Sequence, residues 1–121
     1  MTSRTKRNDA ELPALGFAPA EVAFRRVLEI DRTDLTALSN LGILLAKEGK
    51  LKEAVALLKE AFDRNQDIPS LGKNLARVQC IAGDEAAAHS TLTTALIYSP
   101  GVDDVRELLT TLRKCSPAGA K

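Results

Sequence analysis

The chain repeats itself at a fixed spacing of 34 residues. Between residues 35–68 and 69–102, six pairs are identical at that offset: Asn40/Asn74, Leu41/Leu75, Gly49/Gly83, Ala54/Ala88, Leu58/Leu92 and Ala61/Ala95. A regular period of roughly 20–50 residues is typical of solenoids built from one stacked supersecondary unit. Apolar residues also recur at helical spacing, and no segment shows the strict alternation of a half-buried strand. The sequence therefore predicts an all-α array of helical hairpins.

Small residues and glycines fall where such hairpins need them. Gly42 and Ala54 are predicted to face each other, and small residues at a crossing allow two helix axes to approach closely. Gly49 and Gly83 follow the first helix of each hairpin, where glycine can adopt the left-handed conformation that ends a helix. These positions give each hairpin its close contact and its tight turn.

The pattern resembles the tetratricopeptide repeat, a helical hairpin with a large residue, Leu-Gly, an aromatic, Ala-x-x-x-aromatic and a closing Pro. Leu38-x-x-Leu41-Gly42-x-x-Leu45 followed by Ala54-x-x-x-Leu58 carries the resemblance in one copy, and Ala88-x-x-x-Leu92 and Pro100 carry it in the next. Ala20-x-x-x-Phe24 matches the second half of a preceding copy. Leu38 and Gly72 replace the usual Trp, and we expect Gly72 to leave a gap in the packing.

The repeat phase predicts the organisation of the whole chain. The expected helices are residues 19–31, 35–48, 51–64, 69–82, 85–98 and 102–114. The expected units are an N-terminal tail with an irregular apolar segment (1–18), a half repeat with only its second helix (19–34), two repeats (35–68 and 69–101), a capping helix (102–114) and a flexible tail (115–121). This is a tetratricopeptide-type solenoid of about two and a half repeats plus a C-terminal capping helix.

Composition excludes several classes of function. The net charge is +1 and aromatic residues make up only 3% of the chain, which argues against a nucleic-acid partner. No apolar run is long enough for a membrane span, and no secretory signal is recognisable, so a cytoplasmic location without membrane association is expected. Two cysteines are too few for a disulfide scaffold.

The sequence contains no catalytic constellation. His89 is the only histidine, so a metal site with two histidines from one chain is excluded, and we expect His89 to be an exposed or partly packed helix residue. Nucleotide-binding glycine motifs are also missing. We expect a protein that is not an enzyme and that has no metal or cofactor.

The remaining candidate for a functional site is the surface of the helices. The resemblance implies that the first helix of each hairpin lines a concave groove that binds a segment of a partner protein. The groove residues are Thr36, Ser39, Asn40, Ile43 and Lys47 from one hairpin, and Ser70, Lys73, Asn74, Arg77 and Ile81 from the next. Asn40 and Asn74 match the asparagines that hold a peptide in peptide-binding members, and Lys73 with Arg77 adds positive charge. The alternative reading is that these are ordinary structural and solvated residues.

A carboxylate clamp of the kind found in chaperone-binding members would need further basic residues on neighbouring groove helices. Ser39 stands where the first lysine would be, and Asp104 and Leu108 stand where the last basic pair would be. The resemblance therefore does not extend to such a clamp.

The N-terminal end is a second candidate surface. Ala20, Phe24, Val27 and Leu28 form an apolar stripe that a first helix would normally cover, and the polar residues before it cannot supply an equivalent face. Leu12, Leu15 and Phe17 could fold back over the stripe, a second copy could dock there to give a homo-oligomer, or another protein could supply the helix. The same exposed end would arise if the chain were a piece of a longer array.

The sequence thus favours a scaffold or adaptor-type module for protein–protein interaction, which binds a partner segment in its groove. One alternative is an assembly subunit that associates with itself or with a complex through its N-terminal end. Another is an accessory chaperone that shields an apolar segment of a client. The sequence does not identify the partner or the pathway, because unrelated pathways share this fold.

Overall fold

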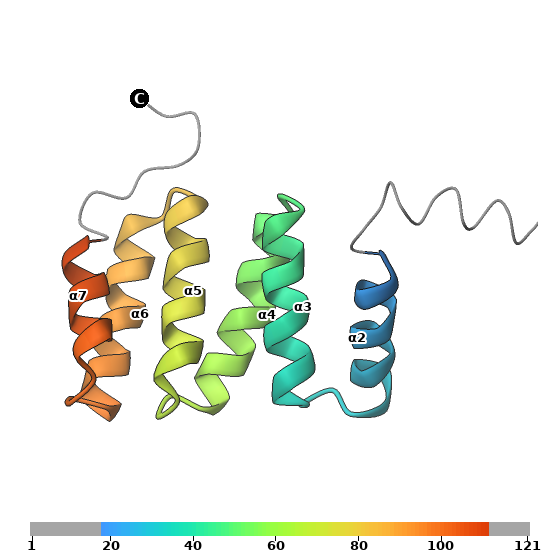
Figure 1. Ribbon diagram of the computed structural model, residues 1–121, viewed down its shortest axis with the longest axis horizontal. Helices are drawn as coiled ribbons and strands as arrows, with labels where there is room; N and C mark the ends of the chain where they lie inside the picture. The colour runs from blue at the N-terminus through green and yellow to red at the C-terminus, as the bar shows by residue number, and fades with distance from the viewer. Residues whose placement is uncertain (1–17, 112–121) are drawn as a thin grey trace, which may run out of the picture.

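The computed structural model describes residues 18–111 of the chain. This part contains six helices and no strand: α2 (Ala18–Ile30), α3 (Leu35–Lys47), α4 (Leu51–Arg64), α5 (Pro69–Ile81), α6 (Glu85–Tyr98) and α7 (Asp103–Thr111). Successive helices run up and down and stand side by side in one elongated array (Figure 1). All six described helices start within one residue of the predicted starts. The predicted tails and the end of the predicted capping helix lie outside the described residues.

Helices α3 and α4 form one hairpin, and α5 and α6 form the next, with α4 packed on α5. The first helices of the two hairpins also touch, α3 on α5, and α5 touches the helix that follows the second hairpin, α7. We call the side formed by α3, α5 and α7 the inner face, and the side formed by α2, α4 and α6 the outer face. This arrangement of the described helices is the all-α hairpin solenoid that the repeat predicted.

Four of the identical pairs lie in the core. Leu41/Leu75, Ala54/Ala88, Leu58/Leu92 and Ala61/Ala95 are all between 0 and 2% exposed. At Gly42, an added Cβ would lie only 2.6 Å from Cγ of Leu58, so α3 and α4 approach too closely there for a larger residue to fit unless Leu58 moves. The repeat therefore preserves the residues that bring two helices together, since burying this apolar surface is what stabilises stacked hairpins.

Both hairpin turns have the same cap. Gly49 and Gly83 have φ angles of 84° and 91°, in the left-handed region that favours glycine. The N–H of Lys50 donates to the carbonyl of Leu45, and that of Gly49 to the carbonyl of Ala46, which is the hydrogen-bond pattern of a Schellman motif. The prediction that these glycines end the first helices is confirmed.

The expected gap at Gly72 is not present. A Cβ added there would lie 3.1 Å from the Cβ of Ala95 and 3.1 Å from Cε1 of Phe62, so neighbouring side chains already fill the space. Phe62 comes from the preceding hairpin and is only 3% exposed. The prediction was wrong because the ring that fills the position belongs to another helix.

Candidate functional site

All ten predicted groove residues lie on α3 and α5, two neighbouring helices of the inner face. Most of them keep contact with solvent. Those on α3 are exposed or half-buried, and those on α5 likewise, with Ile81 48% exposed. Ile43 differs in packing against the core with one side. The first helices thus present a mostly polar strip across two hairpins.

Asn40 and Asn74 are distinctive among the six identical pairs. Four pairs form the core and one forms the turns, whereas Asn40 is exposed and Asn74 is half-buried. Neither amide side chain makes a hydrogen bond to another residue of the described chain. Hydrogen bonding within the described residues therefore gives no reason for asparagine at both positions.

The two basic residues of α5 have different surroundings. The Lys73 ammonium donates a hydrogen bond to the carboxylate of Asp104 at the start of α7. This hydrogen bond lowers the pKa of the Asp104 carboxyl below its ordinary value of 3.8. Arg77 is exposed and has no ion pair within the described residues. A partner carboxylate would compete with Asp104 for Lys73 but would meet Arg77 unopposed.

The apolar stripe predicted on α2 is split between two environments. Phe24 and Leu28 pack against the core, whereas Val27 is 38% exposed. The most open apolar side chains of α2 are Ile30 and Val22, which are 82% and 59% exposed and were not part of the predicted stripe. An end-face contact would therefore involve Val27 and Ile30 more directly than Phe24 or Leu28.

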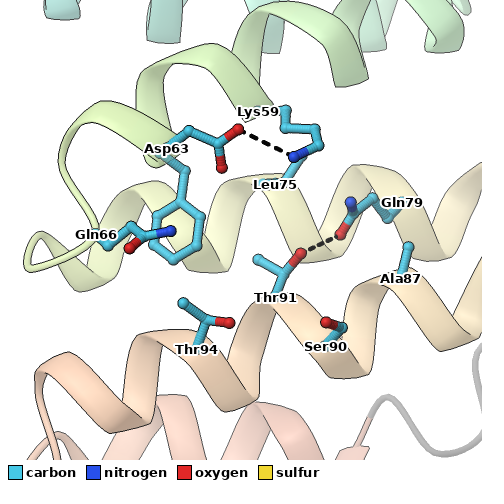
Figure 2. Close-up of a pocket in the computed structure, with 10 residues that line it drawn as sticks. Lys59, Asp63, Gln66, Leu75, Gln79, Ala87, Ser90, Thr91 and Thr94 are labelled. Carbon is cyan, nitrogen blue, oxygen red and sulfur yellow. Dashed lines mark hydrogen bonds and ion pairs between the residues drawn. The ribbon is translucent and has the colours of Figure 1, made fainter.

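The sequence analysis missed a polar pair inside the second hairpin. Oγ1 of Thr91 donates to Oε1 of Gln79 at 2.7 Å, and the two residues are only 8% and 6% exposed (Figure 2). One repeat earlier the same positions are Leu57 and Leu45. This coordinated change from two leucines to a hydrogen-bonded pair was visible in the 34-residue alignment and could have marked the site.

His89 is half-buried, and its Nε2 lies 4.0 Å from Oε2 of Glu85 one turn earlier. Within residues 18–111, no group of three or more His, Cys, Asp or Glu side chains is arranged to hold a metal ion. None of the helices in this same range has the length and apolar character that a membrane span requires.

The stacked hairpins, the exposed polar strip and the repeated caps define a helical-repeat protein of the tetratricopeptide-like class. Comparison with solved structures supports this class. An O-GlcNAc transferase from Thermobaculum terrenum is 28% identical over 76% of this chain, with a TM-score of 0.67. MamA is 20% identical over 84% of this chain, with a TM-score of 0.70. The matches span 18% of the transferase chain and 60% of the MamA chain.

No family model matches the sequence, and no curated protein matches it significantly. The structural likeness therefore supports the tetratricopeptide-like fold and, in general terms, a helical-repeat module for protein interaction.

Proposed function

We propose that this protein is a non-enzymatic interaction module that binds a segment of a partner protein along the inner face of α3 and α5. The observation that carries the proposal is the Asn40/Asn74 pair. It is repeated at the period of the fold, yet neither amide contributes a side-chain hydrogen bond to the described structure. Two amides one repeat apart can pair with the backbone of a bound segment, because each supplies both donors and an acceptor.

Charge adds a preference to this groove. Arg77 has no intramolecular partner among the described residues, so it favours a partner with an acidic group near Asn74. Lys73 contributes less, because Asp104 already offsets its charge. This differs from the expectation that Lys73 and Arg77 act together.

The experiment begins with affinity capture and mass spectrometry to identify the partner, followed by binding measurements on variants. Asn74→Ala and Arg77→Ala should each weaken binding several-fold, and rising salt should weaken it further because a solvent-exposed charge contact is screened. Lys52→Ala removes an exposed positive charge from the outer face and is the matched control. Binding that is insensitive to both groove substitutions and to salt would place the contact elsewhere.

A second candidate is assembly through the N-terminal end, which the exposed side chains of Val27 and Ile30 on α2 favour. The free energy falls when a second surface covers apolar side chains that are exposed to water. Sedimentation across a concentration series should then show self-association that Ile30→Glu abolishes. Ile97→Glu, at a 70% exposed site on α6, is the matched control. A monomer at all concentrations would exclude self-assembly through this end.

A further inference from the structure

The outer face has two cavities that are related by the repeat. The first, of about 450 Å³, lies between α2 and α4 and is lined by Arg25, Leu28, Glu29, Arg32, Leu41, Glu53 and Leu57. The second, of about 300 Å³, lies between α4 and α6. Adding 34 to each of the seven residue numbers gives Lys59, Phe62, Asp63, Gln66, Leu75, Ala87 and Thr91, and all seven line the second cavity. The two cavities are therefore equivalent positions of one repeating architecture.

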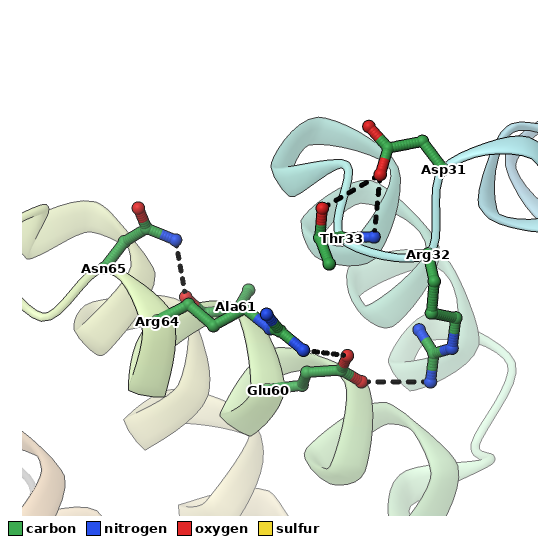
Figure 3. Close-up of polar contacts among 7 residues, drawn as sticks. All are labelled: Asp31, Arg32, Thr33, Glu60, Ala61, Arg64 and Asn65. Atoms are coloured by element: carbon green, nitrogen blue, oxygen red, sulfur yellow. Dashed lines mark hydrogen bonds and ion pairs between the residues drawn. The ribbon is translucent and has the colours of Figure 1, made fainter.

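In the first cavity, the chain supplies its own carboxylates. Arg25 on α2 donates to Glu53 on α4 at 2.9 Å, and Arg32 in the turn after α2 donates to Glu60 on α4 at 3.0 Å (Figure 3 shows the second pair). The hydrogen bond to Glu53 raises the pKa of Arg25. Both ion pairs link residues 28 positions apart, so a basic residue on or just after α2 meets an acidic residue on α4, the second helix of the next hairpin.

In the second cavity, both carboxylates are missing. The residues that correspond to Glu53 and Glu60 are Ala87 and Thr94, while the basic residue that corresponds to Arg25 is kept as Lys59. Ala87 cannot reach across to α4, and the space between the helices stays open (Figure 2). A cation thus remains at the edge of a cavity from which its repeat-related anion has been lost.

The remaining lining of the second cavity suits a carboxylate. Ser90 and Thr94 offer hydroxyl donors from α6, and Gln66 offers an amide donor beyond the end of α4. The floor has the buried Gln79–Thr91 hydrogen bond, whereas the first cavity has Leu57 at the position of Thr91 and no residue equivalent to Gln79 in its lining, so the floor is more polar than its counterpart. A carboxylate accepts hydrogen bonds only, and this ring of donors matches that requirement.

One group opposes an anion. Asp63 also lines the cavity, and its Oδ2 lies 3.0 Å from Nζ of Lys59. Both side chains are at least half exposed, at 59% and 50%, and an exposed pair one helical turn apart is weak and easily exchanged. Glu29 occupies the equivalent position in the first cavity, where Arg25 nevertheless binds Glu53. A carboxylate at this site is therefore compatible with an acidic neighbour.

We propose that the cavity between α4 and α6 binds an aspartate or glutamate side chain of a partner protein, which takes the place that Glu53 holds in the first cavity. This site lies on the outer face and is independent of the inner-face groove, because none of the ten groove residues lines it. A partner that carries two separate acidic and extended segments could then contact both faces of the array.

The test titrates the full chain with the capped tripeptide acetyl-Gly-Glu-Gly-amide and measures binding from the amide chemical shifts of the protein by NMR. The peptide should give saturable shifts at Lys59, Ser90 and Thr94, and the isosteric glutamine peptide should not. Lys59→Gln should weaken the effect by about tenfold or more, since a charged hydrogen bond is lost. Arg77→Ala should leave it unchanged and separates this site from the groove.

Ala87→Glu is the decisive variant. It places a carboxylate 28 residues after Lys59, at the spacing that separates Glu53 from Arg25. This carboxylate of the chain itself should bind Lys59 and prevent the peptide from binding. Ala87→Gln has the same size without the charge and should block less. The proposal is overturned if the glutamate and glutamine peptides shift the same residues equally, if neither binds, or if Ala87→Glu leaves binding intact. Acetate ion that binds as tightly as the peptide would overturn the assignment to a partner's side chain.

Discussion

The tight contact between Gly42 on α3 and Leu58 on α4 gives a sharp test of the fold. In α3, Gly42 is buried against α4, and Gly42→Ala would place a Cβ 2.6 Å from Cγ and 2.9 Å from Cδ2 of Leu58. Leu58 would have to retreat by about 1 Å to reach an ordinary carbon–carbon contact. It is only 1% exposed, and the carbonyl oxygen of Ala54 lies 3.4 Å from the same added Cβ, so little space is available.

Two opposing terms set the magnitude. Alanine favours a helix interior over glycine by about 1 kcal/mol, and this would stabilise the variant if packing were unaffected. Overpacking a well-packed core typically costs ~1–3 kcal/mol. Because a buried leucine must move, we expect the packing cost to exceed the propensity gain and Gly42→Ala to lose up to roughly 2 kcal/mol of unfolding free energy.

Urea denaturation followed by far-UV circular dichroism measures this free energy directly. Ala56→Gly, at an exposed site of α4, is the matched control, because it changes helix propensity in the opposite sense without a packing term. Adding the stability lost in Ala56→Gly to the loss measured for Gly42→Ala cancels the propensity contribution and leaves the packing cost of the crossing. A Gly42→Ala protein that is more stable than the parent would refute the close contact between α3 and α4.

Thr91→Val should lower the free energy of unfolding by about 1–2 kcal/mol, because it leaves the buried Oε1 of Gln79 without its donor. The double variant Thr91→Leu with Gln79→Leu carries the residues found one repeat earlier and should restore the stability. Thermal unfolding measures both effects. The Asp104 carboxyl should titrate below 3.8 in an NMR pH series, and Lys73→Met should return its midpoint toward that value. Since the folded-state pKa is lowered, this ion pair stabilises the fold above the ordinary pKa and is lost as the pH falls through the lowered one. An Asp104 midpoint unaffected by Lys73→Met would contradict the hydrogen bond between them.

The sequence by itself determined the repeat unit and everything local to it. Residues identical at a spacing of 34 became the buried crossings and the glycine turns, because each hairpin must solve the same packing and capping problem. Periodicity and caps also located the helices closely, since both are encoded within a few neighbouring residues. Asn40 and Asn74 were likewise identifiable, because their repetition needs no knowledge of contacts between hairpins.

Only the tertiary structure decided how one hairpin affects the next. The ring of Phe62 in the first hairpin fills the space beside Gly72 in the second. The carboxylate of Asp104 on α7 accepts a hydrogen bond from Lys73 in the second hairpin. The open cavity between α4 and α6 arises in the same way, from residues that lie 28 positions apart. A repeat pattern specifies which positions face a neighbour, but the side chain that arrives there depends on how the hairpins stack.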